Sequence, residues 1–313
     1  MRPATLALLV VTAIWGSTFF LIKDVVTRIE VADLLAVRFA LASLGLAALL
    51  RLKLRLSRPL LVQGAGLGVL YGGAQILQTL GLAHTAASVS GFLTGLYVVA
   101  TPLLGAAILR QRIRGTTWAA VVLATVGLGV LSLTGVSTGY GELLTVASAV
   151  VYAGHILALS RISTPGTALN LSLIQLVVIT LVCTVLAVLP VSEAGLQLPE
   201  NGRDWLVVAY LGLVAGAVTM VLQTWAQART DPTRAAVIMA MEPVWAAGFA
   251  VAVGSEAVTV RMIIGGLAIL GAMYLAELSG SRPVVRRISG SRWIRTGAGS
   301  PSEDRQDESP SSR

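Results

Sequence analysis

The sequence predicts an all-α membrane protein of ten transmembrane helices, and three observations support this prediction. Of its 313 residues, 55% are hydrophobic and only 12% are charged. The mean hydropathy of +0.81 is too high for a soluble domain, whose surface must be wetted by water. The apolar residues also gather in segments with short connections, so almost all of the chain before residue 280 belongs in or at a bilayer.

Ten such segments can be marked along the chain. The first follows a single Arg, and its apolar run is too long for a cleaved signal peptide, so we expect a retained helix. The segments cover about residues 5–26, 33–51, 60–80, 88–109, 116–134, 141–160, 170–190, 204–226, 234–254 and 260–279.

Basic residues between the segments predict the orientation of the chain. One set of alternate connections holds most of the Arg and Lys, including the clusters at 51–58 and 110–114. The opposite set holds far fewer, namely Lys23, Arg28, Arg203 and Arg261. Because positively charged loops are retained in the cytoplasm, both termini are expected on that side. The net charge of +8 reflects this bias and does not indicate a nucleic-acid-binding face.

The segment from residue 234 to 254 contains a carboxylate in an otherwise apolar span. Glu242 is eight residues beyond Arg234, about 12 Å along a helix, which is near the middle of a bilayer core about 30 Å thick. Burial disfavours its ionised form, so Glu242 is a candidate for loading and releasing a proton or for pairing with a cationic substrate. The alternative is a protonated carboxyl that only steadies packing. Pro243 is expected to kink this helix and to leave the carbonyl of Met239 free.

The two halves of the chain resemble each other. Residues 76–85, ILQTLGLAHT, align without a gap to residues 221–230, VLQTWAQART. Pro102, a second expected kink, then falls opposite Pro243. We therefore predict one five-helix repeat at 5–134 and another at 141–279. Because five is odd, the second repeat enters the membrane from the other side, so the repeats are inverted and can open a site alternately to each face.

Glycines recur at a regular spacing in the third segment. Gly64, Gly68 and Gly72 are four residues apart, so they share one face of a helix. Because glycines let helix backbones approach closely, this spacing predicts a packing contact at an interface between the repeats.

Several stretches carry a resemblance to a known family: WGSTFFLIK in the first segment, RFALA in the second, SGFLTGLYVVATPLLGAAILR in the fourth, and MEPVWAA followed by GSE in the ninth. With the duplicated ten-segment plan, they resemble the EamA-type transporters of the drug/metabolite transporter superfamily over about residues 5–279. The resemblance implies a secondary carrier of the inner membrane that exports amino acids, related metabolites or toxic small molecules. The sequence departs from the family pattern at Arg112, which occupies the position matching Glu256.

Further candidate site residues are polar or aromatic and lie inside the segments. Arg38 is about 7 Å beyond Asp33 along its helix; it is expected to hold a carboxylate, to pair with Glu242, or to snorkel to the interface. The amides and aromatics are candidates for the walls of a pocket, with ordinary core packing as the alternative. These residues are Trp15, Tyr71, Gln75, Gln78, Tyr97, Tyr152, Gln223 and Trp245.

The sequence holds no catalytic constellation. It has two His, no HExxH motif, no phosphate-binding GK[S/T] loop and no GxSxG motif, so no metal, cofactor or enzymatic activity is expected. The alternatives to a transporter are a membrane-embedded lipid-processing enzyme and a non-transporting scaffold or receptor. The expected partners are a small-molecule substrate and the lipid bilayer, with a homodimer as a further option and no nucleic acid.

The tail from residue 280 to 313 changes composition abruptly. A basic half containing Trp293 precedes a run of Ser, Pro, Asp and Glu. Such a segment cannot bury enough apolar surface to fold alone, so it is expected to be a disordered cytoplasmic tail. Its basic half is expected to lie against anionic headgroups.

Overall fold

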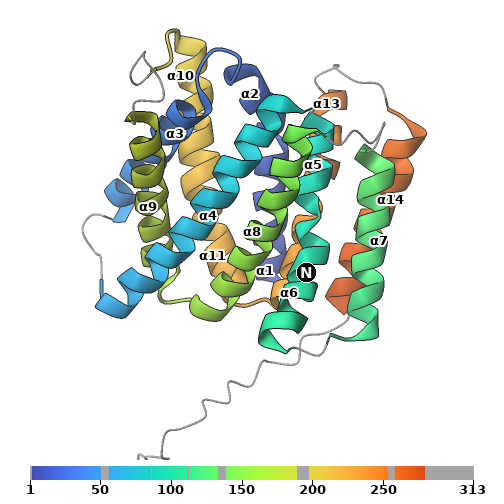
Figure 1. Ribbon diagram of the computed structural model, residues 1–313. Coiled ribbons are helices and arrows are strands. Elements are labelled where there is room, and N and C mark those ends of the chain that lie inside the picture. Colours follow the sequence, from blue (N-terminus) through green and yellow to red (C-terminus); the bar gives the residue numbers. More distant parts are fainter. Residues whose placement is uncertain are drawn as a thin grey trace, which may run out of the picture. The chain divides into compact units, whose positions relative to one another are not determined.

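The computed structural model describes residues 2–50, 56–85, 87–110, 113–132, 139–188, 197–252 and 258–278. Every regular element in these ranges is a helix (Figure 1). The tail at 280–313 lies outside the described residues, as do Arg112 and Glu256, and so do the predictions made for them.

The helices follow the apolar segments predicted from the sequence, and some segments are divided. The undivided segments form α3 (Val31–Leu50), α4 (Arg58–His84), α7 (Gly115–Ser132), α8 (Tyr140–Ile162), α9 (Ala168–Val188) and α14 (Val260–Leu278). The divided segments form α1 (Pro3–Gly16) with α2 (Thr18–Val25), α5 (Ala87–Gly95) with α6 (Tyr97–Leu109), α10 (Gly202–Ala209) with the π-helix η1 (Tyr210–Val218) and α11 (Thr219–Gln227), and α12 (Pro232–Met239) with α13 (Glu242–Ala252).

Seven stretches of the described chain are long and apolar enough to cross a membrane. They are Pro3–Val25, Val31–Leu50, Arg58–His84, Val89–Ile108, Tyr140–Ile162, Ala168–Val188 and Gly202–Gln227. Two apolar helices are shorter, Gly115–Val130 and Val260–Ala276, and the α12–α13 pair is broken in the middle. The protein is therefore a multi-pass membrane protein, and a total of ten passes stays a prediction.

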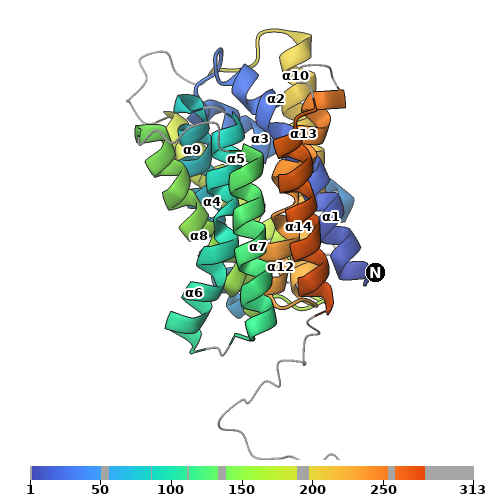
Figure 2. The same cartoon turned by 90° about the vertical axis from the view of Figure 1, so that its right-hand side faces the viewer.

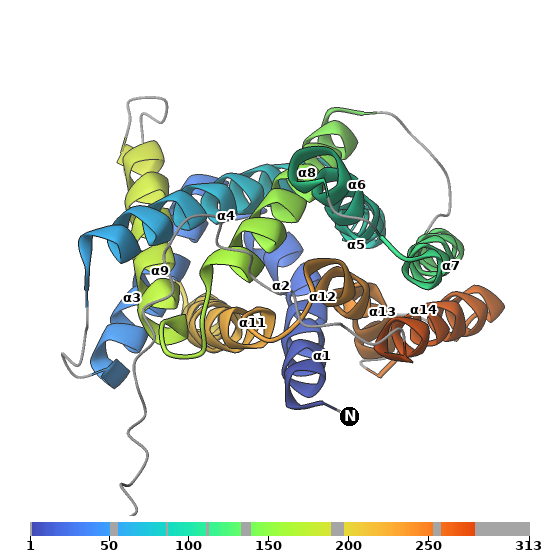
Figure 3. The ribbon, with the colours of Figure 1, turned by 90° about the horizontal axis from the view of Figure 1, so that it is seen from below.

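Helices distant in the sequence pack side by side. Figure 2 shows α7 next to α14, and the strongest other pairings are α4 with α8 and α3 with α9. Seen from below in Figure 3, α1 lies among α11, α12 and α13, all of which it contacts. The first helix is thus held by the last third of the bundle, and the surfaces left outside are rich in exposed Leu, Val and Ile, as lipid contact requires.

Glycines on one face of α4 allow α9 to approach closely. A Cβ on Gly64 would lie 2.6 Å from Cγ2 of Ile174, and a Cβ on Gly68 would lie 2.7 Å from Cβ of Val178. Real side chains do not tolerate such distances, so only glycine permits this contact. The packing role predicted from the spacing of Gly64 and Gly68 is confirmed.

An ionic network joins the end of α2 to the start of α10. The guanidinium of Arg28 donates to carboxylate oxygens of Asp24 and of Asp204, both at 2.8 Å. These hydrogen bonds, first that with Asp24 and then that with Asp204, raise the pKa of Arg28 above its ordinary value. Because Arg28 and Asp24 are exposed, the network contributes more to the position of α10 than to stability.

Candidate functional site

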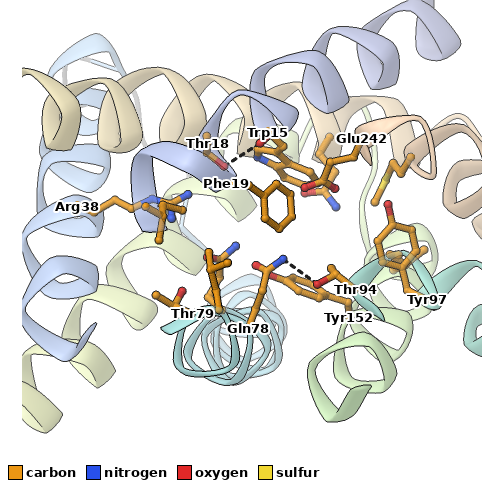
Figure 4. A pocket seen from close by; sticks show the side chains of 16 residues that line it. Trp15, Thr18, Phe19, Arg38, Gln78, Thr79, Thr94, Tyr97, Tyr152 and Glu242 are labelled. Carbon is orange, nitrogen blue, oxygen red and sulfur yellow. Dashed lines mark hydrogen bonds between the residues drawn. The ribbon is translucent and has the colours of Figure 1, made fainter. Parts of the chain in front are cut away.

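Divided and undivided helices together surround a cavity inside the bundle. Its walls come from α1, α2, α3, α4, α5, α6, α8, α11, α12 and α13 (Figure 4). Its volume is about 40 Å³, which is room for about three waters. Most of the candidate residues named from the sequence line it: Trp15, Arg38, Gln75, Gln78, Tyr97, Tyr152, Gln223 and Glu242.

Tyr71 and Trp245 do not line this cavity. The Tyr71 side chain is fully buried behind the wall, where its hydroxyl accepts a hydrogen bond from Nε2 of Gln75 at 3.1 Å. Trp245 is 38% exposed on α13. In this structure Trp245 lies outside the lining of the cavity, and its Cβ faces Gly16 of α1, so a role in the pocket wall stays a prediction.

Glu242 begins α13 directly after the break from α12. Since Pro243 has no N–H, the chain turns at Ala240 and Met241, and the Met241 carbonyl accepts from the N–H groups of Val244 and Trp245. The Glu242 side chain is only 7% exposed, and within the described part of the chain its carboxyl has no hydrogen bond or ion pair. A buried carboxyl that faces a cavity without a protein partner is available to a proton or to a cationic ligand.

Arg38 lies on the opposite side of the cavity from Glu242 (Figure 4). It is 2% exposed, which excludes snorkelling to the interface. No ion pair joins it to Glu242 in the described ranges. Its Nε donates to the carbonyl of Leu211 at 3.2 Å, and its guanidinium carbon lies 5.0 Å from the centre of the Phe39 ring. One edge of the guanidinium is thereby fixed to helix η1.

Two residues that line the cavity donate hydrogen bonds to backbone carbonyls of the π-helix η1. In η1 the carbonyl of Leu211 accepts from Arg38, and the carbonyl of Ala215 accepts from Nε1 of Trp15 at 3.2 Å. The Trp15 Nε1 also lies 3.2 Å from the hydroxyl of Thr219. Stretches of π-helix are rare and are frequently found at functional sites. Here η1 fixes the orientation of an arginine and a tryptophan from different helices.

A hydrogen-bonded chain crosses the cavity wall at Gln78. The hydroxyl of Tyr152 donates to Oε1 of Gln78 at 2.9 Å, and Nε2 of Gln78 donates to the hydroxyl of Thr94 at 3.2 Å. The amide is therefore oriented by helices α5 and α8 together. Because this amide is already ordered, it loses little conformational entropy when it binds a polar ligand group.

Some residues of the cavity were not predicted from the sequence. Thr18, Phe19 and Ile22 line it with Trp15, at spacings of three, four and seven residues. That spacing puts them on one helical face, and it is a signal that was present in the sequence. Phe19 appears between Arg38 and Glu242 in Figure 4, and all three line the cavity.

The interruptions of the first and ninth segments touch each other at Gly16. A Cβ on this glycine would lie 2.7 Å from Cβ of Trp245, 2.8 Å from the carbonyl oxygen of Glu242 and 2.9 Å from the nitrogen of Ala246. Only glycine allows the end of α1 to approach the start of α13 so closely. The break in the fourth segment lies at Leu96 and Pro102 is inside α6, so a kink at Pro102 stays a prediction.

Lys23 joins the end of α2 to the end of α4 beside the cavity. Its Nζ donates to the carbonyls of Leu82 at 2.8 Å, Ala83 at 3.1 Å and Thr85 at 2.9 Å. These carbonyls belong to the last turn of α4 and its cap residue, where no intrahelical donor remains for them. The lysine therefore ties α2 to α4 next to Ile22 and Leu82, which line the cavity.

We expect Lys23→Met to weaken this connection. Methionine keeps the apolar stem but donates nothing to the α4 carbonyls, so the free energy of unfolding should fall by about 1–3 kcal/mol. Thermal unfolding of the purified protein measures the change. Arg203→Gln, at an exposed side chain 4.0 Å from Asp24, is the control that should leave stability unaltered. Equal melting temperatures for both variants would contradict this role of Lys23.

A bundle of membrane-spanning helices, broken around a buried polar cavity, is an arrangement typical of membrane transporters. The chain belongs to the EamA-like transporter family, whose model matches residues 2–133 and 139–278. It is 29% identical over 283 residues to a protein of Archaeoglobus fulgidus described as an uncharacterized transporter, with 88% of this chain and 86% of the relative covered. A solved crystal structure with 20% identity superposes with a TM-score of 0.73, covering 88% of this chain and 96% of that one. The protein is therefore a membrane transporter, and its family points away from an enzyme.

Proposed function

We propose that the protein is a secondary transporter that exports small metabolites by alternating access and uses Glu242 to couple export to protons. The observation that carries this proposal is the Glu242 carboxyl, buried at a helix break, facing the cavity and without a described protein partner. Such a group can alternate between a proton and a cationic substrate. The substrates we expect are amino acids, related metabolites and toxic small molecules.

The two ends of the cavity fit a zwitterion. Arg38 at one end can hold a carboxylate, and Glu242 at the other can hold an amine. The fixed amide of Gln78 and the aromatic rings of Trp15 and Tyr152 lie between them. A cavity of about 40 Å³ is too small for an amino acid, so binding requires the helices around it to move apart. Movement of this kind is what alternating access demands.

We further propose that the helices form two inverted five-helix repeats, at residues 5–134 and 141–279. The family model matches twice, once on each half. The packing is consistent with two equivalent halves. The third segment of the first half (α4) packs on the first segment of the second half (α8), and the third segment of the second half (α11) packs on the first segment of the first half (α1). The fifth segments of the two halves, α7 and α14, pack on each other. The fourth and ninth segments, equivalent in the repeats, are both broken near their middle.

Orientation follows from charge. In Figure 2, α1 begins and α14 ends toward the same side of the bundle. The clusters of basic residues in alternate connections favour the cytoplasm for that side, and we propose the cell's inner membrane as the location.

Flux in proteoliposomes tests the proposal. Purified protein is reconstituted, the vesicles are loaded with single amino acids, and efflux is followed with and without a proton gradient. We expect gradient-dependent efflux of at least one of them, and unchanged efflux after deletion of residues 281–313. If no amino acid, analogue or toxicant moved under any gradient, the proposal would fail. Transport that vanished with the tail would favour a scaffold or receptor.

A further inference from the structure

A second cavity lies at the end of the bundle where α1 begins. It is formed by the start of α1, the end of α11, the connection to α12 and the start of α12. Its volume is about 300 Å³, at the lower end of the range of ligand pockets. It shares no lining residue with the central cavity, so transport by the route proposed above does not explain it.

Three arginines line this second cavity, and among the described residues no Asp or Glu lines it. They are Arg2 from the start of α1, Arg229 from the connection after α11, and Arg234 from the first turn of α12. Like charges gathered in one partly buried cavity repel each other, and an anion among them removes this cost. The cavity is therefore matched to a negatively charged ligand.

One guanidinium group is held in place before any ligand arrives, and a second arginine of the cavity is buried. Arg229 lies with its guanidinium carbon 4.0 Å from the centre of the Trp225 ring, and its Nη1 donates to the Trp225 carbonyl at 2.9 Å. Arg234 is only 5% exposed. A pre-oriented arginine loses less entropy on binding than a mobile one.

Asp231 precedes α12 next to the cavity, and its negative charge acts on Arg234. Oδ1 of Asp231 accepts hydrogen bonds from the N–H groups of Thr233 at 3.0 Å and Arg234 at 3.3 Å, so it caps α12. Pro3, Ala4 and Thr5 complete the cavity with the first turn of α1, and Arg2, the cap residue of that helix, supplies no side-chain hydrogen bond to it. The positive end of the α1 dipole adds to the preference for an anion.

We propose that this cavity binds a phosphate group, either of a phospholipid headgroup or of a free phosphate compound. Planar guanidinium groups match phosphate oxygens in pairs, and three of them can engage more oxygens than a carboxylate offers. Trp225, an amphipathic ring at the end of a membrane-spanning stretch, is a side chain typical of the bilayer border. The site would tie the start of α1 to the α11–α12 connection, two parts of the bundle that belong to opposite ends of the chain.

Binding to the purified full-length protein tests this proposal without any transport assay. In detergent, inorganic phosphate and glycerol 3-phosphate are titrated by isothermal calorimetry. In parallel, the protein is placed in nanodiscs of phosphatidylcholine with or without phosphatidylglycerol, and bound lipid is counted by native mass spectrometry. Wild type is compared with Arg229→Gln, with Arg234→Gln, and with Arg58→Gln, an exposed arginine at the start of α4 outside the cavity.

We expect each cavity variant to weaken binding by about fivefold, and Arg58→Gln to leave it unchanged. Retention of phosphatidylglycerol without binding of the soluble compounds identifies a lipid site, and binding of the soluble compounds in detergent identifies a free phosphate site. Arg229 is at the surface, so its variant should fold even if Arg234→Gln does not. No binding of any of these ligands, or equal loss in Arg58→Gln, would overturn the proposal.

Discussion

Glu242→Gln should reduce proton-driven efflux to the level of liposomes without protein, while the amount of folded protein in the membrane stays unchanged. Glutamine has nearly the same size as a protonated glutamate, so the packing at the start of α13 is preserved. It cannot gain or lose a proton, and it cannot neutralise a cationic substrate. Efflux under a series of pH gradients, together with gel filtration of the variant, measures both parts of this prediction.

The matched control is Glu30→Gln, at an exposed carboxylate in the connection between α2 and α3. Its removal changes the net charge by the same amount at a site remote from the cavity, so efflux should persist. If Glu242→Gln retained wild-type efflux and its dependence on pH, the Glu242 carboxyl would have no part in coupling.

The second large effect is expected for Gly16→Ala. The added methyl group would meet the Cβ of Trp245 and the backbone of Glu242 and Ala246 at 2.7–2.9 Å, which forces α1 away from α13. Overpacking of this kind lowers the free energy of unfolding by about 1–3 kcal/mol. Because the contact joins the breaks beside the cavity, efflux should fall more than stability alone explains. Thermal unfolding and efflux of the same preparation measure the two effects.

Gly154→Ala is the control for this substitution. Gly154 is in the middle of α8, and a Cβ there would have no neighbouring atom within 4 Å. Alanine favours the helix over glycine, so this variant should be as stable as wild type or slightly more stable. Equal behaviour of the two alanine variants would mean that the contact between the breaks is unimportant.

Much of the fold was accessible from the sequence because lipid imposes a simple rule. Each apolar stretch must satisfy its own backbone hydrogen bonds, so its position along the chain already marks a helix. The glycine spacing on α4 likewise predicted a close helix contact, which Gly64 and Gly68 make with α9. Polar residues such as Arg38, Gln78 and Glu242 are costly in lipid, and most of those named from the sequence do meet in one cavity.

What the sequence concealed depends on contacts between distant segments. The fourth segment breaks at Leu96, directly after Gly95, a position that the sequence analysis did not single out. The carbonyls of the π-helix η1 accept hydrogen bonds from Arg38 and Trp15, which belong to other helices, so the sequence of η1 alone does not reveal them. The role of Lys23 was missed because its partners are backbone carbonyls of α4, which no side-chain pattern reveals. Trp245 does not line the cavity, because an aromatic residue close to Glu242 in the sequence need not face the site.

Access to the cavity from each side of the membrane tests the central claim most directly. The chain has one cysteine, Cys183, which is buried and can be replaced by alanine to give a cysteine-free background. Thr94→Cys then places a thiol beside Gln78 in the cavity wall. A membrane-impermeant thiol reagent is applied to right-side-out and to inside-out vesicles, with and without a proton gradient. Alternating access predicts labelling from both sides, in proportions that the gradient shifts. Labelling from one side only under every condition would contradict it.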